Sequence, residues 1–309
     1  MTTDLPAIPG VSPVLEVPFH PDGSLDEGGF STVVERVLDT GVGSVMFPGF
    51  ASEFHKLSDA ERTRLLAVLL GHTGNREDVC AIVSIPDHGT VSALARAHEA
   101  VEAGADAINL LPPHFLGPTR DAVTAHLAAV LDAVASLPVI LQYAPAQTGT
   151  ALDADGIREL AAAHPNLRMV KVESQPPHRL VAALGHGPRP LPAMVGYAGV
   201  QLPAALDAGA VGVQPGCSFV EIYQEIWRLH TLGDGAAARA LHGRLLPYIS
   251  TWMQHVELIV AAEKLVSVRR GWFASAHCRA PGWILDRTEL ALVDRFVEEF
   301  AYLLPKVAA

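Results

Sequence analysis

The sequence predicts a (β/α)8 barrel followed by a helical extension. Over residues 1–230, short apolar, β-branched runs alternate with amphipathic stretches of helical length. Strands that alternate with helices form parallel sheets, and eight such units are the number that closes a barrel. Beyond residue 231 only helical patterns remain. We therefore expect a barrel catalytic domain over residues 1–230 and a three-helix extension over residues 231–309.

The expected strands share apolar, β-branched runs bounded by Gly, Pro or polar residues. In chain order they cover Val11–Val17, Ser44–Phe47, Val79–Ile85, Ala107–Leu111, Val139–Tyr143, Arg168–Val172, Ala193–Val195 and Gly212–Gln214. The eighth has the weakest pattern, because it is short, begins at Gly and is followed by Pro.

The segments between these strands carry apolar residues at helical spacing. They cover Gly28–Thr40, Asp59–Gly71, Val91–Ala103, Arg120–Ala135, Ala154–Ala163, Pro177–Leu184, Val200–Ala208 and Val220–Leu229, and the extension adds Gly235–Ile249, Met253–Arg269 and Arg287–Leu304. Ser58 and Glu61 have the spacing of a capping box. Glycines suited to helix ends stand at Gly41, Gly71, Gly104, Gly209 and Gly233.

The composition argues against several classes of function. The 309 residues carry a net charge of −11 and no basic stripe, so we expect neither a nucleic-acid nor a membrane partner. Met1–Pro6 lacks the pattern of a secretory signal. Cys80, Cys217 and Cys278 lack CxxC spacing and suit reduced thiols in a cytoplasm. The 14 histidines include no HExxH motif, so we expect no metal, and a metal-dependent barrel hydrolase is an alternative.

Lys171 is the strongest candidate for chemistry, because it interrupts an apolar strand in a chain with only four lysines. A lysine is rarely buried without a reason, and burial favours the neutral amine, which can form a Schiff base with a carbonyl. Alternation along the strand places Met169, Lys171 and Glu173 on one face, at the end of the strand where barrels carry their active sites. The plainer alternative is an amine that reaches solvent or pairs with Glu173.

Four separated segments resemble one family. Val17–Asp26 resembles a T-P-F-x-x-D-G-S-x-D start, Gly49–Arg62 resembles a G-T-T-G-E-x-x-x-L-S-x-x-E-R segment, and Arg279–Pro281 resembles a closing R-x-P. Val170-Lys171 falls at the family's Schiff-base lysine. The family is that of the pyruvate-dependent class I aldolases and dehydratases typified by dihydrodipicolinate synthase and N-acetylneuraminate lyase. The resemblance implies a metal- and cofactor-free lyase in which Lys171 attacks pyruvate or another 2-oxo acid, with an aldehyde as partner.

The chain departs from the family at the G-T-T-G-E segment, where Phe50, Ala51 and Ser52 replace T-T-G. In the family the second hydroxyl helps to hold the substrate carboxylate. The Ser52 hydroxyl and the amides of Ala51 and Ser52 are the expected substitutes, since amides in a tight turn suit an anion. The alternative is a pocket that no longer binds a carboxylate. Glu53 matches the family's acid, and we expect it to have a structural role in the loop, where it accepts backbone N–H bonds.

A second departure affects proton transfer. Gln142 stands at the position of the family's catalytic tyrosine, and Tyr143 follows one residue later. A shift of one residue turns a strand side chain to the other face, so Tyr143 can replace the family tyrosine only if a bulge re-aims it. His114 falls at a second family tyrosine, which reaches into a neighbouring subunit, and imidazole suits acid–base work. Glu173 is another candidate for acid–base work. The alternative for His114 is an ordinary loop histidine without a catalytic role.

Further departures concern the second substrate. Gln147 replaces the family arginine that grips the carboxylate of aspartate semialdehyde, which argues against that acceptor. Gly196 matches a glycine that lines the pyruvate site. An apolar aldehyde is suggested by Phe50, Pro113, Phe115 and Tyr197.

We therefore expect a cytoplasmic lyase. The resemblance implies a homo-oligomer, commonly a tetramer in the family, and a tetramer or a dimer is our expectation. A catalytically idle paralogue that binds a small carbonyl compound is the main alternative. Aldol cleavage, addition and dehydration are left open.

Overall fold

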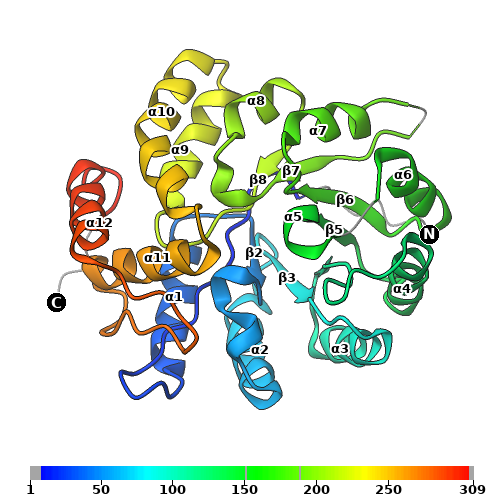
Figure 1. Cartoon of the computed structure of the whole chain (residues 1–309), viewed down its shortest axis with the longest axis horizontal. Helices are drawn as coiled ribbons and strands as arrows, with labels where there is room; N and C mark the ends of the chain where they lie inside the picture. Colours follow the sequence, from blue (N-terminus) through cyan, green and yellow to red (C-terminus); the bar gives the residue numbers. More distant parts are fainter. Residues whose placement is uncertain (1–7, 150–151, 188, 306–309) are drawn as a thin grey trace. The chain divides into compact units, whose positions relative to one another are not determined.

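The computed structural model describes residues 8–149, 152–187 and 189–305 (Figure 1). They fall into two compact units. The first unit comprises the chain up to Ser12 together with Cys80–Gln214, and the second comprises Pro13–Val79 and the chain from Pro215 onward. The expected absence of a secretory signal rests on residues outside the described ranges. Between residues 8 and 305, no described helix is long and apolar enough to cross a membrane.

Seven strands of the first unit form a parallel sheet. They are β1 (Gly10–Val11), β3 (Cys80–Ile85), β4 (Ala107–Leu110), β5 (Val139–Tyr143), β6 (Leu167–Val172), β7 (Ala193–Val195) and β8 (Gly212–Val213). Their order is β1-β8-β7-β6-β5-β4-β3. The first strand thus pairs with the last, with Gly10 opposite Gly212, as in a closing barrel. A Cβ at Gly212 would lie 2.2 Å from the Gly10 carbonyl oxygen, so this close strand pairing requires glycine.

The helices of the first unit are α3 (Thr90–Ala103), α4 (Arg120–Ala133), α5 (Pro145–Thr148), α6 (Ala154–Ala163), α7 (Pro177–Gly185) and α8 (Leu202–Asp207), with the 3-10 helix η3 (Tyr197–Gly199). Figure 1 shows α3, α4, α6 and α7 along the outside of this unit's strands. Each turns its apolar stripe inward; α4, for example, buries Val123, Leu127 and Val130. The short α5 and η3, which the sequence patterns did not indicate, directly follow β5 and β7.

The second unit contains β2 (Ser44–Phe47), α1 (Glu27–Asp39), α2 (Asp59–Thr73), α9 (Val220–Thr231), α10 (Gly235–Trp252), α11 (Val256–Arg270) and α12 (Arg287–Glu299), with the 3-10 helices η1 (Phe50–Ser52) and η2 (Phe54–Lys56). Aromatic side chains of α9, α10 and α12 form its core, with the Phe296 ring centroid 5.1 Å from those of Tyr248 and Trp252. Ser58 and Glu61 form the expected capping box at α2.

Eight strands alternate with helices in the described part of the chain, and the fold class predicted from sequence is confirmed. Several local predictions were wrong, among them the helix expected over Arg287–Leu304, which ends at Glu299. The strand expected over Val11–Val17 is reduced to two residues, because Pro13 lacks a ladder N–H; Val14 then makes isolated bridges to Met46 and Gly216. Gly71 does not end its helix, which continues to Thr73. The domain boundary expected near residue 230 stays a prediction.

Candidate functional site

Lys171 is buried in β6, with 4% of its surface exposed. It pairs in register with Gln142 of β5 and Met194 of β7. Residues that pair in a parallel sheet turn their side chains to the same face, so Gln142 and Lys171 share one side of the sheet. The burial expected for Lys171 from its strand is therefore present in the structure.

The Glu173 carboxylate forms an ion pair with the Lys171 amine. Glu173 Oε1 lies 3.4 Å from Lys171 Nζ and accepts a 3.1 Å hydrogen bond from the Tyr197 backbone N–H. Glu173 Oε2 accepts a 2.7 Å bond from Gln142 Nε2. All three partners are donors, so the two carboxylate oxygens act as acceptors for each of them. The expected alternative, an ion pair between Lys171 and Glu173, is thus also observed.

A hydrogen-bonded series, which we call the amide chain, leads from this carboxylate across two further strands. It runs from Glu173 through Gln142 and Asn109 to Ser84. Asn109 Nδ2 donates to Gln142 Oε1 and to Ser84 Oγ, both at 2.9 Å. A carboxylate can only accept, so Gln142 must present its NH2 to Glu173 and its carbonyl to Asn109. Glu173 therefore fixes the direction of every bond in the chain.

The sequence patterns gave no indication of a role for Asn109 or Ser84. The available signal was one polar residue in each of two apolar strands, Ala107–Leu110 and Cys80–Ile85. Such residues are common, and their meaning depends on which strands lie side by side. Asn109 is fully buried, and its Oδ1 has no partner among the described residues. An unsatisfied buried carbonyl destabilises a fold, which makes the presence of Asn109 here harder to explain by packing alone.

Gly196 leaves room for the Glu173 carboxylate. A Cβ at Gly196 would lie 2.2 Å from Glu173 Oε1. The next residues, Tyr197 and Ala198, have left-handed backbone conformations with φ of 56° and 48°. Such conformations are strained for residues with a Cβ and concentrate at functional sites. Together they direct the Tyr197 N–H at the carboxylate.

Tyr143 lies on the other face of β5 and pairs with Val172. The pairing of β5 with β6 is irregular only between Val139 and Ile140 among the described pairs, which leaves Gln142 opposite Lys171. The Tyr143 hydroxyl donates a 2.5 Å hydrogen bond to the Leu152 carbonyl. Burial raises the pKa of Tyr143, which keeps the phenol protonated.

His114 lies in the loop after β4, half-buried, with its ring 6.2 Å from that of His88 and perpendicular to it. His88 Nδ1 accepts a 2.8 Å hydrogen bond from the Phe115 N–H, a role for His88 that the sequence gave no reason to expect. Gln147 lies in α5, and its Oε1 is buried without a partner in the described residues.

Phe50, Ala51 and Ser52 form η1 in the second unit. The Ser52 hydroxyl donates to the Leu15 carbonyl at 2.5 Å, and the Ser52 N–H donates to the Gly49 carbonyl at 3.0 Å. Both Ser52 donors therefore serve the backbone. The roles expected for the three residues toward substrate stay predictions.

Glu53 follows η1 and is fully buried. It accepts hydrogen bonds from the amines of Lys56 and Lys264, instead of the backbone bonds that we expected. These two ion pairs hold the Glu53 side chain in place within the second unit.

The described residues contain no group of three or more His, Cys, Asp or Glu side chains placed to hold a metal ion. Cys80, Cys217 and Cys278 are free thiols. Burial raises the pKa of Cys80 to about 12 and that of Cys278 to about 11, so neither is an activated nucleophile.

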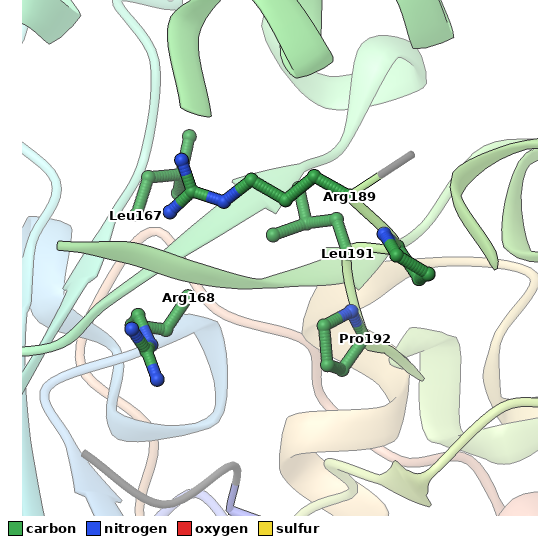
Figure 2. A pocket seen from close by; sticks show the side chains of 6 residues that line it. Leu167, Arg168, Arg189, Leu191 and Pro192 are labelled. Carbon is green, nitrogen blue, oxygen red and sulfur yellow. The ribbon is translucent and has the colours of Figure 1, made fainter. Parts of the chain in front are cut away.

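A cavity of about 240 Å³ lies at the opposite end of β6, where the strand begins (Figure 2). It is lined by Leu167, Arg168, Arg189, Pro190, Leu191 and Pro192. The Arg189 guanidinium donates to the Ala161 carbonyl at 2.8 Å. Since barrels carry their chemistry at the carboxyl ends of the strands, this cavity is separate from the candidate site.

Known proteins resemble the chain over nearly its whole length. A 4-hydroxy-tetrahydrodipicolinate synthase of Xanthomonas campestris pv. campestris is 29% identical over 246 residues, which cover 79% of this chain and 80% of that protein. An uncharacterised DapA-like lyase of Rhizobium meliloti is 34% identical over 152 residues, which cover 49% of each chain. The solved dihydrodipicolinate synthase of Rhodopseudomonas palustris has the same fold, with a TM-score of 0.86, 24% identity and coverage of 94% of this chain and 97% of that one.

The model of the dihydrodipicolinate synthetase family matches residues 7–299. This range includes all eight strands, Lys171 with its neighbours, and the helices that follow. The expected family, fold and enzyme class, a lyase, are thereby confirmed. The chain belongs to the dihydrodipicolinate synthetase family.

Proposed function

We propose that the protein is a Schiff-base lyase that acts on pyruvate or another 2-oxo acid through Lys171. The observation that carries this proposal is a buried lysine at the carboxyl end of an apolar barrel strand, with a carboxylate 3.4 Å from its amine. Burying an amine costs desolvation free energy, which argues for a role of Lys171 beyond packing. The Schiff base then serves as the electron sink for cleaving or forming a bond at the neighbouring carbon. This chemistry requires neither a metal nor a cofactor.

The second substrate differs, in this proposal, from that of the synthases. Gln147 carries no charge, and its Oε1 lacks a partner in the described residues, so it suits a hydrogen-bond donor better than a carboxylate. An apolar aldehyde remains our prediction for this partner. Steady-state activity with polyhydroxylated sugar acids above that with apolar aldehydes would contradict it. We further propose that the protein is a homo-oligomer and that it acts in the cytoplasm.

Reductive trapping tests the Schiff base directly. The protein is incubated with pyruvate and a panel of 2-oxo acids, reduced with borohydride and mapped by peptide mass. The chain has only four lysines, so the peptide with Lys264 serves as an internal control. An adduct on the Lys171 peptide alone is expected. Absence of an adduct with every donor, on folded protein, would favour the idle paralogue.

A further inference from the structure

The proposed Schiff-base function, on which this inference rests, leaves open which group moves protons at Lys171. Gln142, at the position of the family tyrosine, has no titratable proton. Tyr143 lies on the opposite face of the strand, with its hydroxyl bound to the Leu152 carbonyl. A proton-transfer group must lie within hydrogen-bonding reach of the reacting atom, although such contacts are often long before substrate binds. Glu173, 3.4 Å from the amine, meets this requirement.

We propose that Glu173 carries protons to and from Lys171 Nζ and that the amide chain holds its carboxylate in position. Glu173 then acts as a catalytic residue, whereas Asn109, Gln142 and Ser84 are positioning residues. Two features of the site support this assignment beyond the ion pair. Gly196 and the left-handed Tyr197 give the carboxylate both space and a backbone donor. Asn109 has a buried oxygen without a partner among the described residues, at the place where its NH2 orients Gln142.

The proton balance of Schiff-base formation defines the task. The Lys171 ammonium carries three protons, and the iminium carries one. Glu173 first accepts a proton from the ammonium, the freed amine forms the C–N bond, and the carbonyl oxygen takes that proton as its π bond breaks. Glu173 then accepts the second proton from the carbinolamine nitrogen and delivers it to the hydroxyl group. The C–O bond breaks, water leaves, the nitrogen lone pair forms C=N, and Glu173 ends as the carboxylate with which it began.

The first test compares Glu173→Gln and Glu173→Asp with the wild type in the rate of borohydride trapping at varied 2-oxo acid concentrations. Glu173→Gln keeps the size and one hydrogen-bond acceptor but cannot carry a proton. We expect its trapping rate at saturation to fall about 100-fold, with little change in the half-saturating concentration. Glu173→Asp should recover part of the rate. A folded Glu173→Gln protein that traps at the wild-type rate would overturn the proposal.

A matched pair of asparagine variants tests the positioning role and does not depend on the folding of Glu173→Gln. Asn109 and Asn166 are both buried, and each Nδ2 donates two hydrogen bonds, those of Asn166 reaching the Leu131 and Val134 carbonyls. Asn109→Leu should slow trapping about 10-fold through misplacement of Glu173. Asn166→Leu should lower stability and leave the trapping rate unchanged. Equal slowing in both would overturn the positioning role, whereas a wild type that forms no Lys171 adduct would instead remove the Schiff-base function itself.

Discussion

The two units each contain a buried lysine, and the comparison shows how a structural amine differs from the amine that we propose to be reactive. Lys264 of α11 is fully buried and donates hydrogen bonds to Glu53 and to the His277 carbonyl, the latter at 3.1 Å, with the amine 4.3 Å from the Phe19 ring centroid. Lys171 is almost as buried, yet its ion pair in the described residues is a single longer contact with Glu173. The number of acceptors around the amine among the described residues, rather than burial, therefore distinguishes the two sites.

The carboxylate partners differ in the same way. Glu53 binds two lysines, Lys264 and Lys56, and thus belongs to a network of charges that hold one another in place. Glu173 is held by neutral amides, from Gln142 and Tyr197, and these donors stay in place when Lys171 loses its charge. An ion network is suited to locking a structure, whereas neutral donors allow the charge of the amine to change during a reaction.

The largest expected effect concerns Lys264. Lys264→Met leaves buried Glu53 with a single cation, and removing one partner of a buried ion pair typically lowers stability by about 3–5 kcal/mol. Lys171→Met leaves Glu173 with its two amide donors, so we expect a loss below about 1 kcal/mol or a gain. Urea unfolding of both variants measures the difference. Equal losses would contradict the distinction between the two lysines.

A second prediction concerns the pH dependence of stability in the second unit, where the charge of Lys264 acts on Glu16. Burial raises the pKa of Glu16 to about 7, against the opposing effects of Ser267 and Lys264. The folded protein therefore holds a proton that the unfolded chain releases at lower pH. The stability that this provides is fully present below about pH 4.5 and is lost as the pH rises through about 7.

The shift in the pKa of Glu16 corresponds to a loss of about 3 kcal/mol in the free energy of unfolding at alkaline pH. Glu16→Gln should remove this dependence, and urea unfolding at about pH 5 and about pH 8 should give more similar free energies than in the wild type. Glu225→Gln on the surface of α9 is the matched control, and we expect it to retain the wild-type difference. An unchanged pH profile in Glu16→Gln would show that the carboxyl does not titrate in this range.

A third prediction tests whether the space that Gly196 leaves is needed to position the Glu173 carboxylate. Gly196→Ala places a Cβ where Glu173 Oε1 lies, so the carboxylate must move, and overpacking of this kind typically costs about 1–3 kcal/mol. Borohydride trapping on Lys171 should slow as well. Gly185→Ala, at the end of α7, meets no atom within 4 Å and serves as control, with stability unchanged or slightly raised. Normal trapping in Gly196→Ala would show that the position of Glu173 is unimportant.

The smallest effect is expected at Tyr143. Tyr143→Phe removes the hydrogen bond to the Leu152 carbonyl and should lower stability by about 1 kcal/mol. Because this side chain faces away from Lys171, the trapping rate should stay at the wild-type value. A large loss of trapping would instead assign proton transfer to the phenol and weaken the role of Glu173.

The sequence by itself determined the parts of the site that depend on local periodicity. Lys171 and Glu173 share a face because strand side chains alternate with period two, and the same rule separates Gln142 from Tyr143. The alternation of strands and helices was likewise sufficient for the barrel. These features depend on residues that are close together in the sequence, so they could be predicted from the sequence alone.

Only the tertiary structure determined which side chains form hydrogen bonds with one another. Lys264 bonds to Glu53 across 211 positions of the chain, and Asn109 reaches Gln142 across 33, so neither contact leaves a local pattern. Only the packed structure shows that the Lys264 amine has two hydrogen-bond acceptors, whereas the Lys171 amine has one longer ion-pair contact among the described residues. Burial and hydrogen bonding are properties of the packed neighbours, and these come from distant segments of the chain.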